Sequence, residues 1–402
     1  MMNILVSGAG IAGPTLAYWL RQAGHEVTVV ERAPDLRTGG QAVDLRGVGR
    51  TVVDRMGLMP RVSSMMLEQR GMSWVDARGR ARARMTVDAF DGEGFISEIE
   101  ILRGDLVQIL FDLTQDEVGY VFDDTITALV QDDGGVDVEF LRSASRRFDL
   151  VIGADGLGSV VRRSAFGEVG KTSLDCGIAW FTVPDPGDLG GWYEMFPAGR
   201  GRVASIRPGR VPGEAKASLG MRIDARSQLP GGRAAQQAAL AQRFDGVGGR
   251  VPSLLAAMGS APDFSFAEIG QIHLPSWSHG RIALIGDAAA SPSPLTGLGT
   301  SVALVQAYVL AGELARAGGD HRRAFQHYEE ICRPYVTEAQ QLPPGGAAGF
   351  APDSRLMIGL QVLSMRLAGH WPIRAMLAKQ FAKAAALDLP DYLIRPSGRV
   401  PG

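Results

Sequence analysis

The chain has 402 residues, more than one hydrophobic core usually serves, so we expect two closely associated domains. Its 41 basic and 43 acidic residues give a net charge of -2, which leaves no overall field to attract nucleic acid or an anionic membrane and favours small substrates. Cys176 and Cys332 lack metal-ligand and CxxC spacing, so they predict free thiols. The lack of a signal-peptide pattern before Asn3 predicts a cytoplasmic protein.

The first elements form a βαβ unit. Residues 3–7 are continuously apolar, which is typical of a parallel strand buried on both faces. Apolar residues then recur at near-helical period over residues 12–23, and Gly24 ends this helix. Residues 26–31 alternate into a second strand.

The later elements follow from periodicity and turn residues. We expect a glycine-rich loop at 39–49, a helix at 103–113, short strands within 119–152 and a mostly two-residue period over 177–224. A strand at 281–286 precedes helices at about 299–317 and 320–333, and a Pro- and Gly-rich linker at 342–352 leads to two tail helices.

The first turn has the chemistry of a dinucleotide site. Gly8 permits a tight turn, Gly10 allows the backbone to approach a pyrophosphate and Gly13 allows close helix packing. Glu31 ends the second strand where a carboxylate accepts hydrogen bonds from an adenosine ribose. A glycine-rich turn beside a surface glutamate is the plain structural alternative, but the complete βαβ unit favours the dinucleotide.

Two later turns favour FAD over NAD. Asp155 and Gly156 follow one apolar strand, and Gly286 with Asp287 follows another. The Asp287 carboxylate is placed to hold a ribityl hydroxyl, and the helix starting near Gly299 directs its positive end toward a flavin ring. Taken alone, each aspartate also fits an ordinary turn or helix cap.

These residues resemble the FAD-dependent aromatic hydroxylases of the para-hydroxybenzoate hydroxylase type, over most of the chain. The matching motifs are Gly8, Gly10, Gly13 and Glu31; Asp155 and Gly156; Gly286 and Asp287 with Pro294, Gly297 and Gly299; and Arg103, Leu106 and Leu110 in an Arg-x-x-Leu-x-x-x-Leu pattern. The chain's size and C-terminal helices look closest to the tetracycline-inactivating and polyketide-tailoring branch of class A monooxygenases.

The resemblance implies an α/β fold with a Rossmann-like FAD-binding domain of the GR2 type, an inserted mixed β-sheet substrate domain and C-terminal helices. The expected FAD-binding domain comprises residues 1–71, 103–172 and 272–340, and the substrate-binding domain comprises 72–102 and 173–271. Residues 341–402 form the linker and C-terminal helices, the last of which we expect to pack against the FAD-binding domain rather than lie on a membrane.

The resemblance also implies the chemistry. NADPH or NADH reduces FAD, O2 forms a flavin C4a-hydroperoxide, and one oxygen atom passes to an aromatic or polyketide-like small molecule. The protein then has to position the substrate and exclude water, so no acid or base catalyst is assigned, and Pro294 and Gly297 are candidates near the ring.

The expected cofactor contacts combine the three turns, the loop at 39–47 and Arg103. They are Gly8, Gly10, Ile11, Ala12, Gly13, Glu31, Arg32, Val43, Asp44, Arg46, Arg103, Asp155, Gly156, Gly286, Asp287, Pro294, Gly297, Leu298, Gly299 and Thr300. The substrate candidates are Trp180, Trp192, Tyr193, Phe196, Arg207, Met221 and Pro294, with Phe181, Met195 and Arg222 as further possibilities. For most of these side chains, ordinary sheet core is the plain alternative.

Two positions depart from the family pattern. Ala290 and Leu298 stand where many relatives have His and Gln, which removes polar groups near the ring. A substrate-activation step of the phenol hydroxylase kind therefore does not transfer to this chain.

Other functions stay open at this point. A halogenase or reductase of the same fold is one alternative, although the nearest string to a Trp-x-Trp-x-Ile-Pro signature is residues 180–184. A flavoprotein that only sequesters a ligand is another. The six histidines show no metal-like cluster, and we expect a monomer or weak homodimer that binds no nucleic acid.

Overall fold

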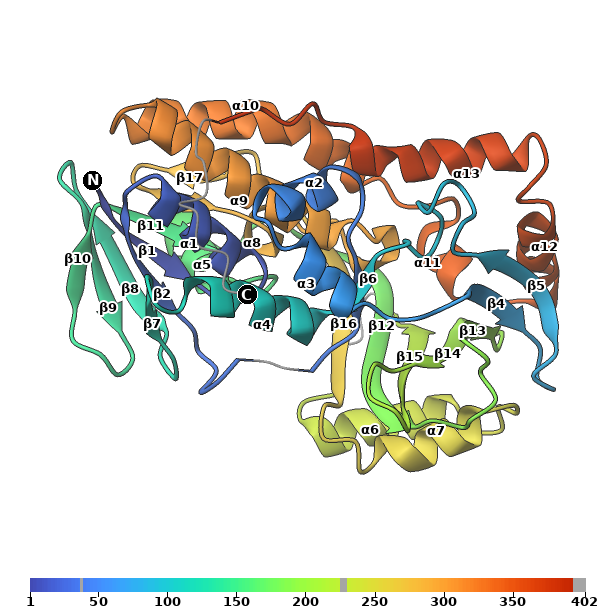
Figure 1. Ribbon diagram of the computed structural model, residues 1–402. Coiled ribbons are helices and arrows are strands. Elements are labelled where there is room, and N and C mark those ends of the chain that lie inside the picture. Colours follow the sequence, from blue (N-terminus) through green and yellow to red (C-terminus); the bar gives the residue numbers. More distant parts are fainter. Residues whose placement is uncertain (37–38, 225–229, 393–402) are drawn as a thin grey trace.

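A computed structural model describes residues 1–36, 39–224 and 230–392. In these residues the strands form a six-stranded sheet, a seven-stranded sheet and two smaller sheets. The two large sheets lie side by side, and the helices after residue 299 run along the molecule above both (Figure 1). The α/β fold with a Rossmann-like unit and a second mixed sheet is therefore confirmed.

The six-stranded sheet contains the predicted βαβ unit. Parallel pairing joins β2, β1, β11 and β18 in that order, β7 pairs in parallel with β2, and β17 pairs antiparallel with β18. The strands span Asn3–Ser7 (β1), Glu26–Val30 (β2), Gly119–Val121 (β7), Leu150–Gly153 (β11), Ser278–His279 (β17) and Ile282–Leu284 (β18). Ile4, Leu5 and Val6 are fully buried, as predicted for a central parallel strand.

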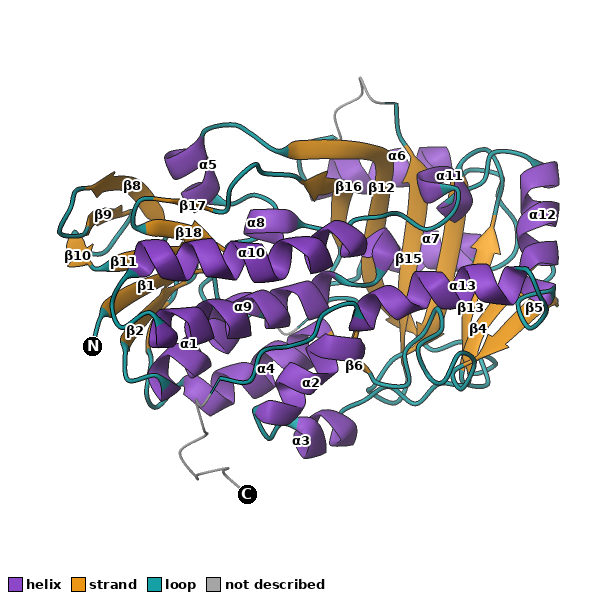
Figure 2. Cartoon of the chain, turned by 90° about the horizontal axis from the view of Figure 1, so that it is seen from above, coloured by secondary structure: helices purple, strands orange, loops and turns teal. Residues whose placement is uncertain are grey.

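Helices cover this sheet. Helix α1 packs against α9, which in turn packs against α2 and α10, and α9 and α10 lie side by side (Figure 2). These and the neighbouring helices span Ala12–Gln22 (α1), Gly47–Arg55 (α2), Met59–Ser64 (α3), Arg103–Thr114 (α4), Val160–Phe166 (α5), Asp287–Ala290 (α8), Gly299–Arg316 (α9) and His321–Ala339 (α10). Helix α10 continues through Pro334 to Ala339, so the end predicted near residue 333 was too early.

Two small sheets complete this half of the molecule. A three-stranded antiparallel sheet contains β8 (Ile126–Gln131), β9 (Val136–Phe140) and β10 (Arg146–Phe148). A two-stranded sheet pairs β3 (Ala42–Asp44) with β6 (Glu100–Leu102), directly before α4. This pairing brings the loop after residue 39 to the start of α4.

The seven-stranded sheet has the order β16-β12-β15-β14-β13-β4-β5 and is antiparallel except for the β13–β4 pair. Its strands span Gly71–Val75 (β4), Ala81–Thr86 (β5), Lys171–Pro184 (β12), Trp192–Pro197 (β13), Arg202–Pro208 (β14), Glu214–Arg222 (β15) and Ser265–Ile272 (β16). Helices α6 (Arg233–Arg243) and α7 (Val251–Met258) bury one face through Leu240, Phe244 and Leu254.

The C-terminal segment differs from the prediction in two ways. The expected linker contains a short helix, α11 (Gly346–Phe350), before the two expected helices α12 (Arg355–Arg366) and α13 (Ile373–Phe381). Helix α13 packs through Leu377 against Trp74 and Met85 of the seven-stranded sheet, not against the six-stranded sheet region. Two short 3-10 helices also occur, η1 (Pro294–Thr296) and η2 (Ala382–Ala385), and η2 contacts α2 and α10.

Candidate active site

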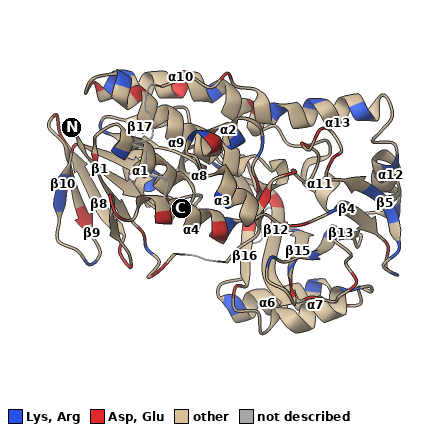
Figure 3. Ribbon diagram, in the orientation of Figure 1, with Lys and Arg blue, Asp and Glu red and all other residues tan. Residues whose placement is uncertain are grey.

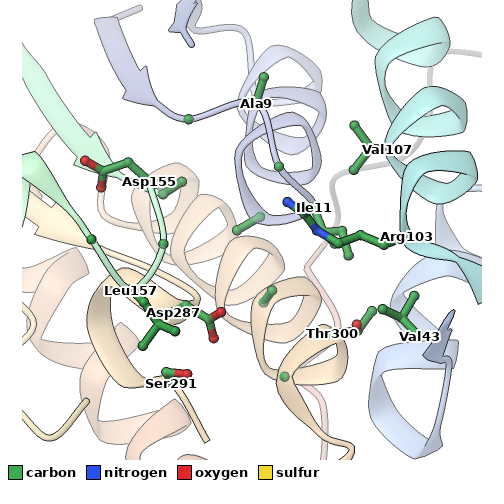
Figure 4. Close-up of a pocket in the computed structure, with 18 of the residues that line it drawn as sticks. Ala9, Ile11, Val43, Arg103, Val107, Asp155, Leu157, Asp287, Ser291 and Thr300 are labelled. Atoms are coloured by element: carbon green, nitrogen blue, oxygen red, sulfur yellow. The ribbon is translucent and has the colours of Figure 1, made fainter. Parts of the chain in front are cut away.

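The three predicted turns meet at one edge of the six-stranded sheet. They follow β1, β11 and β18, whose carboxyl ends line up because the strands are parallel. Together with Arg103 they enclose a cleft of about 520 Å³, and Asp287 and Arg103 both point into it (Figure 4). Ligands of open α/β sheets bind at this edge.

The turn after β1 gives its glycines different tasks. Gly8 has φ +106°, and a Cβ there would lie 2.6 Å from the Ala154 carbonyl oxygen. A Cβ on Gly13 would lie 1.9 Å from the Gly8 carbonyl oxygen, so Gly13 permits the packing of α1 against the turn. By contrast, a Cβ on Gly10 would meet only Arg103 Nη2, at 3.7 Å. The packing of the chain therefore does not require a glycine at position 10.

The start of α1 is available to an anion. Its N-cap residue, Ile11, makes no side-chain hydrogen bond to the first turn, and Gly10, Ile11 and Ala12 line the cleft. The first N–H groups of a helix lack intrahelical acceptors, and the helix dipole adds positive charge there. A pyrophosphate suits this position.

Glu31 follows β2 and is held by two backbone donors. Its carboxylate accepts hydrogen bonds from the N–H groups of Ala9 and Ala33, both at 2.9 Å. These bonds fix the side chain at the end of the cleft, where Arg32 also lies.

Asp155 in the middle turn also stabilises its own backbone. The carboxylate accepts hydrogen bonds from Ser159 Oγ at 2.5 Å and from the Val160 N–H at 2.7 Å, at the start of α5. The buried Arg162 donates to the Ala288 carbonyl at 3.0 Å and to the Leu157 carbonyl, so it connects the second turn to the third. Sequence reasoning missed Arg162, because nothing in its local pattern distinguishes it from a surface arginine.

Asp287 lies at the start of α8 and is half-buried in the wall of the cleft. Burial raises the pKa of its carboxyl group, and a hydrogen bond with Ser291 and the positive charge of Arg103 partly oppose this shift. Gln306, fully buried on α9, accepts a hydrogen bond from the Gly286 N–H at 2.7 Å and so fixes the third turn. Sequence reasoning missed Gln306, whose partner is 20 residues away.

A second cavity of about 610 Å³ lies beside the cleft. Residues Gln41, Ala42, Asp44, Trp180, Pro294 and Gly297 line both spaces, so the two are neighbours. The seven-stranded sheet contributes Trp180, Tyr193, Met195 and Arg207 to its wall, and the C-terminal segment contributes Phe350 and Phe381. The second cavity is mainly apolar, whereas the cleft is built around backbone and charged groups.

A buried polar cluster interrupts the apolar wall. Arg207 donates to Glu100 Oε1 at 2.6 Å, also contacts Glu100 Oε2 and Gln69, and stacks over the Tyr193 ring with its Cζ 4.8 Å from the ring centroid. Burial alone lowers the pKa of Arg207, but the Glu100 carboxylate outweighs burial and raises it. Arg207 is therefore charged and already paired in the cavity wall.

Asp44 lies at the boundary of the two spaces. Its carboxylate accepts a hydrogen bond from the Ser97 N–H at 3.0 Å and pairs with Arg46 at 3.2 Å. Burial raises the pKa of Asp44, the Arg46 charge opposes this shift, and Glu100 adds to it. Asp44 is thus a partly buried acid that lines both the cleft and the second cavity.

Several expected contacts lie elsewhere. The Arg46 guanidinium donates to the carbonyls of Glu93, Gly94 and Phe95, so it holds that loop and lines the second cavity instead of the cleft. Leu298 also lines the second cavity. Gly13 and Gly286 lie behind the cleft wall as packing positions, since a Cβ on Gly286 would lie 3.1 Å from Ala12 Cβ.

Three substrate candidates are on the wrong face of the seven-stranded sheet. Trp192 and Phe196 alternate with Tyr193 and Met195 along β13, so they point away from the second cavity. Trp192 stacks with Arg84, and Phe196 and Met221 pack in the core beneath α6 and α7. Arg222 pairs with Asp353 instead of lining the cavity.

The donor set of the cleft fits FAD. The cleft is lined by a helix N-terminus without a side-chain cap, by the carboxylates of Glu31 and Asp287, and by a second uncapped helix start at Gly299 and Thr300. A pyrophosphate, two polyol segments and an electron-accepting ring need groups of these kinds. No cluster of three or more metal-ligating side chains and no helix long and apolar enough to cross a membrane occurs within residues 1–36, 39–224 and 230–392.

Comparison with known proteins identifies the family. The family model described as FAD binding domain matches residues 1–342. An uncharacterized protein of Mycobacterium tuberculosis is 44% identical over 360 residues, covering 88% of this chain and 95% of that protein. A flavin-dependent monooxygenase from an unknown prokaryotic organism is 38% identical, covering 88% of this chain and 91% of that protein.

A solved structure agrees with these relatives. The tetracycline destructase Tet(51) superimposes with a TM-score of 0.83 at 32% identity, covering 97% of this chain and 99% of that chain. The protein therefore uses FAD and belongs to the class A FAD-dependent monooxygenases, as its motifs predicted.

Proposed function

We propose that the protein inserts one oxygen atom from O2 into an aromatic or polyketide-like small molecule, with NADPH or NADH as reductant. One observation carries the proposal. The apolar second cavity shares Asp44, Trp180, Pro294 and Gly297 with the cofactor cleft, so a ligand in this cavity borders the cofactor. A cleft with a ligand cavity at one end is suited to chemistry at their boundary.

The cleft residues bind FAD in this proposal. The N-terminus of α1 and Arg103 hold the pyrophosphate, Glu31 holds the adenosine ribose and Asp287 holds the ribityl chain. The start of α9, at Gly299 and Thr300, stabilises negative charge on the ring. When bound, FAD accepts electrons from the nicotinamide and activates O2, which amino-acid side chains do not do.

The second cavity selects the substrate. Trp180, Tyr193 and Phe381 offer aromatic walls, and Tet(51) is named for a polycyclic polyketide. Arg207, paired with Glu100, orients a polar group of the substrate, and Ser205 and Ser218 offer further hydroxyls. The C-terminal helices α11 to α13 cover the cavity and exclude water from it.

The domain assignment follows from the separate roles of the cleft, which binds the cofactor, and the second cavity, which binds the substrate. We assign FAD binding to the region of the six-stranded sheet and substrate binding to the seven-stranded sheet, with the predicted boundaries. The C-terminal helices belong with the substrate side, since α12 contacts β5 and α13 packs on β4 and β5. The cytoplasmic location and the monomer or weak homodimer stay predictions.

The proposal is tested by coupling two readouts. Purified, FAD-loaded protein is screened with planar polycyclic phenols for stimulated oxidation of NADPH and of NADH, and products from reactions under isotopic O2 are weighed by mass spectrometry. We expect stimulation together with a gain of one labelled oxygen atom.

Three other results contradict the proposal. Incorporation of halide supports a halogenase, and turnover without O2 supports a reductase. Tight binding of the phenols without NAD(P)H consumption supports a protein that only sequesters its ligand. Each of these outcomes leaves the FAD-binding role of the cleft intact.

A further inference from the structure

The C-terminal helices expose an apolar surface, most of which lies outside the second cavity. Six of the eleven exposed large hydrophobic side chains in the described part of the chain lie between residues 356 and 376. Four of them, Leu356, Leu360, Leu363 and Leu367, are spaced four, three and four residues apart along and just beyond α12. At helical period this spacing places them on one face, which we call the leucine face.

Most of the leucine face is turned away from the core, and only Leu360 of its four leucines also lines the second cavity. Helix α12 packs on β5 with its opposite side, where Val362 and Met365 join the cluster around Trp74. Leu356 keeps 74% of its surface exposed, and Trp371, in the turn after the helix, keeps 84% exposed. Contiguous exposed apolar surface of this kind marks an interaction site.

Positive charge surrounds the leucine face. Residues 354–387 contain no Asp or Glu, and Arg355, Arg366, Arg374 and Lys379 lie on or beside the C-terminal helices, whereas Lys383 is buried. The neighbouring strand β5 and its approach add four exposed arginines, of which Arg82 pairs with Asp76. Figure 3 shows Lys and Arg along α12, α13 and β5, at one end of a molecule whose net charge is -2.

We propose that this end of the protein adsorbs to an anionic phospholipid bilayer, with the leucine face and Trp371 in the headgroup region. Leucine and tryptophan flanked by Lys and Arg are the residues that helices lying in a membrane interface use. A second copy of the chain fits less well, because two such surfaces would bring their basic flanks together without acidic partners. An anionic lipid surface satisfies both the apolar and the charged residues.

Adsorption has a consequence for substrate access. The inner sides of α12 and α13 line the second cavity, through Met365, Gln380 and Phe381 among others. Leu360 and Met376 are exposed and also line the cavity, so docking places this side of the cavity against the lipid, and an apolar substrate dissolved in the bilayer enters beside them. This consequence rests on the proposed function, whereas adsorption itself does not.

Vesicle flotation tests the adsorption directly. The FAD-loaded protein is mixed with vesicles of phosphatidylcholine alone or with about one third phosphatidylglycerol, which carries the anionic surface charge. We expect binding to the anionic vesicles and release in about 1 M NaCl, where the Debye length falls to about 3 Å. We also expect a blue shift of tryptophan emission on binding, which W371F removes without removing binding.

Matched variants separate the apolar and charged contributions. Leu356→Glu with Leu363→Glu is expected to abolish flotation, whereas Val130→Glu with Leu141→Glu, equally exposed on the distant three-stranded sheet, is expected to leave it unchanged. Arg374→Gln with Lys379→Gln should weaken the partition coefficient by about 25-fold, taking roughly fivefold per basic residue near an anionic leaflet. Arg322→Gln with Arg323→Gln on α10 is the charge-matched control.

Several outcomes would overturn the proposal. One is no binding to either vesicle type by protein that retains its flavin absorption. Equal binding to neutral and anionic vesicles is another. A third is a concentration-dependent dimer in light scattering that Leu356→Glu with Leu363→Glu dissociates, because it assigns the leucine face to a second copy. Since flotation does not measure turnover, failure of the proposed oxygenation leaves this test valid.

Discussion

The cofactor cleft and the second cavity are built in opposite ways. In the cleft, three short turns contribute backbone groups to the wall, and Gly8 and Gly10 lie where an added Cβ would change the turn or the wall. In the second cavity, side chains from β12, β13, β14 and the C-terminal helices meet across a sheet. In our proposal the cleft binds FAD through main-chain geometry, and the second cavity binds the substrate through side-chain shape and one buried ion pair.

Because of this difference, we expect the cleft and the second cavity to tolerate different substitutions. A site formed by backbone groups loses ligand binding when an added Cβ occupies the space of the ligand, whether or not the new side chain is polar. A cavity formed by side chains binds its ligand more weakly when a wall side chain is made smaller or loses its hydrogen-bond partner. The following variants sharpen this contrast.

The largest effect is expected from G13A. The added Cβ would lie 1.9 Å from the Gly8 carbonyl oxygen, so α1 has to move away from the turn. We expect a loss of about 3 kcal/mol in the free energy of unfolding, measured by chemical denaturation of the apoprotein. G359A is the matched control, because nothing lies within 4 Å of its Cβ. A G13A variant as stable as G359A would contradict the role of this packing.

D287A is expected to affect FAD without unfolding the chain. It removes a half-buried acceptor in the cleft, and losing hydrogen bonds to a charged group costs about 1.5 to 3 kcal/mol, or roughly 10- to 150-fold in Kd. Flavin fluorescence titration measures the Kd. D287N keeps an acceptor oxygen and should lose less, so equal losses for both variants would show that only the charge matters. Unchanged affinity in D287A would remove Asp287 from the cofactor site.

Trp180 and Trp192 test the two faces of the seven-stranded sheet. W180A enlarges the second cavity at its boundary with the cleft, and we expect about a tenfold rise in the KM of a stimulating aromatic substrate. W192A removes a side chain that stacks on Arg84 on the other face, and the KM should stay within about twofold. Similar KM changes in both variants would mean that substrate binds elsewhere.

A smaller effect concerns Asp263, which lines the second cavity. Burial raises the pKa of this carboxyl group, but hydrogen bonds from Thr182 N–H at 2.8 Å and Thr182 Oγ1 at 2.6 Å, with Lys216 nearby, lower it overall. A lowered native pKa contributes stability that is present above the unfolded pKa, about 3.9, and is lost as the pH falls through the native pKa.

D263N should therefore cost about 1 kcal/mol at pH 7. Thermal unfolding of the wild type and D263N is compared over a range of pH. The difference in Tm should shrink below about pH 4, as Asp263 becomes protonated in the wild type. A difference that grows toward low pH would show that the sign is wrong.

The cleft was largely predictable from the sequence, for a physical reason. Gly8, Gly10 and Asp287 each sit within a few residues of a buried strand, so local spacing specifies where they lie. Arg162 and Gln306 were not predictable, because each acts on a turn far away in the chain. The family resemblance predicted a cofactor contact for Arg46. Its guanidinium instead donates hydrogen bonds to the carbonyls of residues 93–95.

The second cavity was predictable only in outline. The sequence showed that side chains along β13 alternate between the two faces of the sheet. Which face lines the cavity depends on α6 and α7, because they cover the other face. Tyr193 and Arg207 were placed correctly at the cavity wall, and Trp192, Phe196 and Met221 were not. The contribution of α12 and α13 to the wall follows from long-range packing, which no local pattern encodes.

In our proposal, the close backbone approach that Gly10 permits is what allows FAD to bind in the cleft. The most direct measurement is the FAD Kd of G10V, together with the Tm of its apoprotein. A Cβ at Gly10 would meet only Arg103 Nη2 at 3.7 Å, so we expect a Tm close to that of the wild type. The Kd should rise by about a hundredfold, equivalent to about 2.7 kcal/mol. Wild-type FAD affinity in G10V would show that FAD binding does not depend on a glycine at this position.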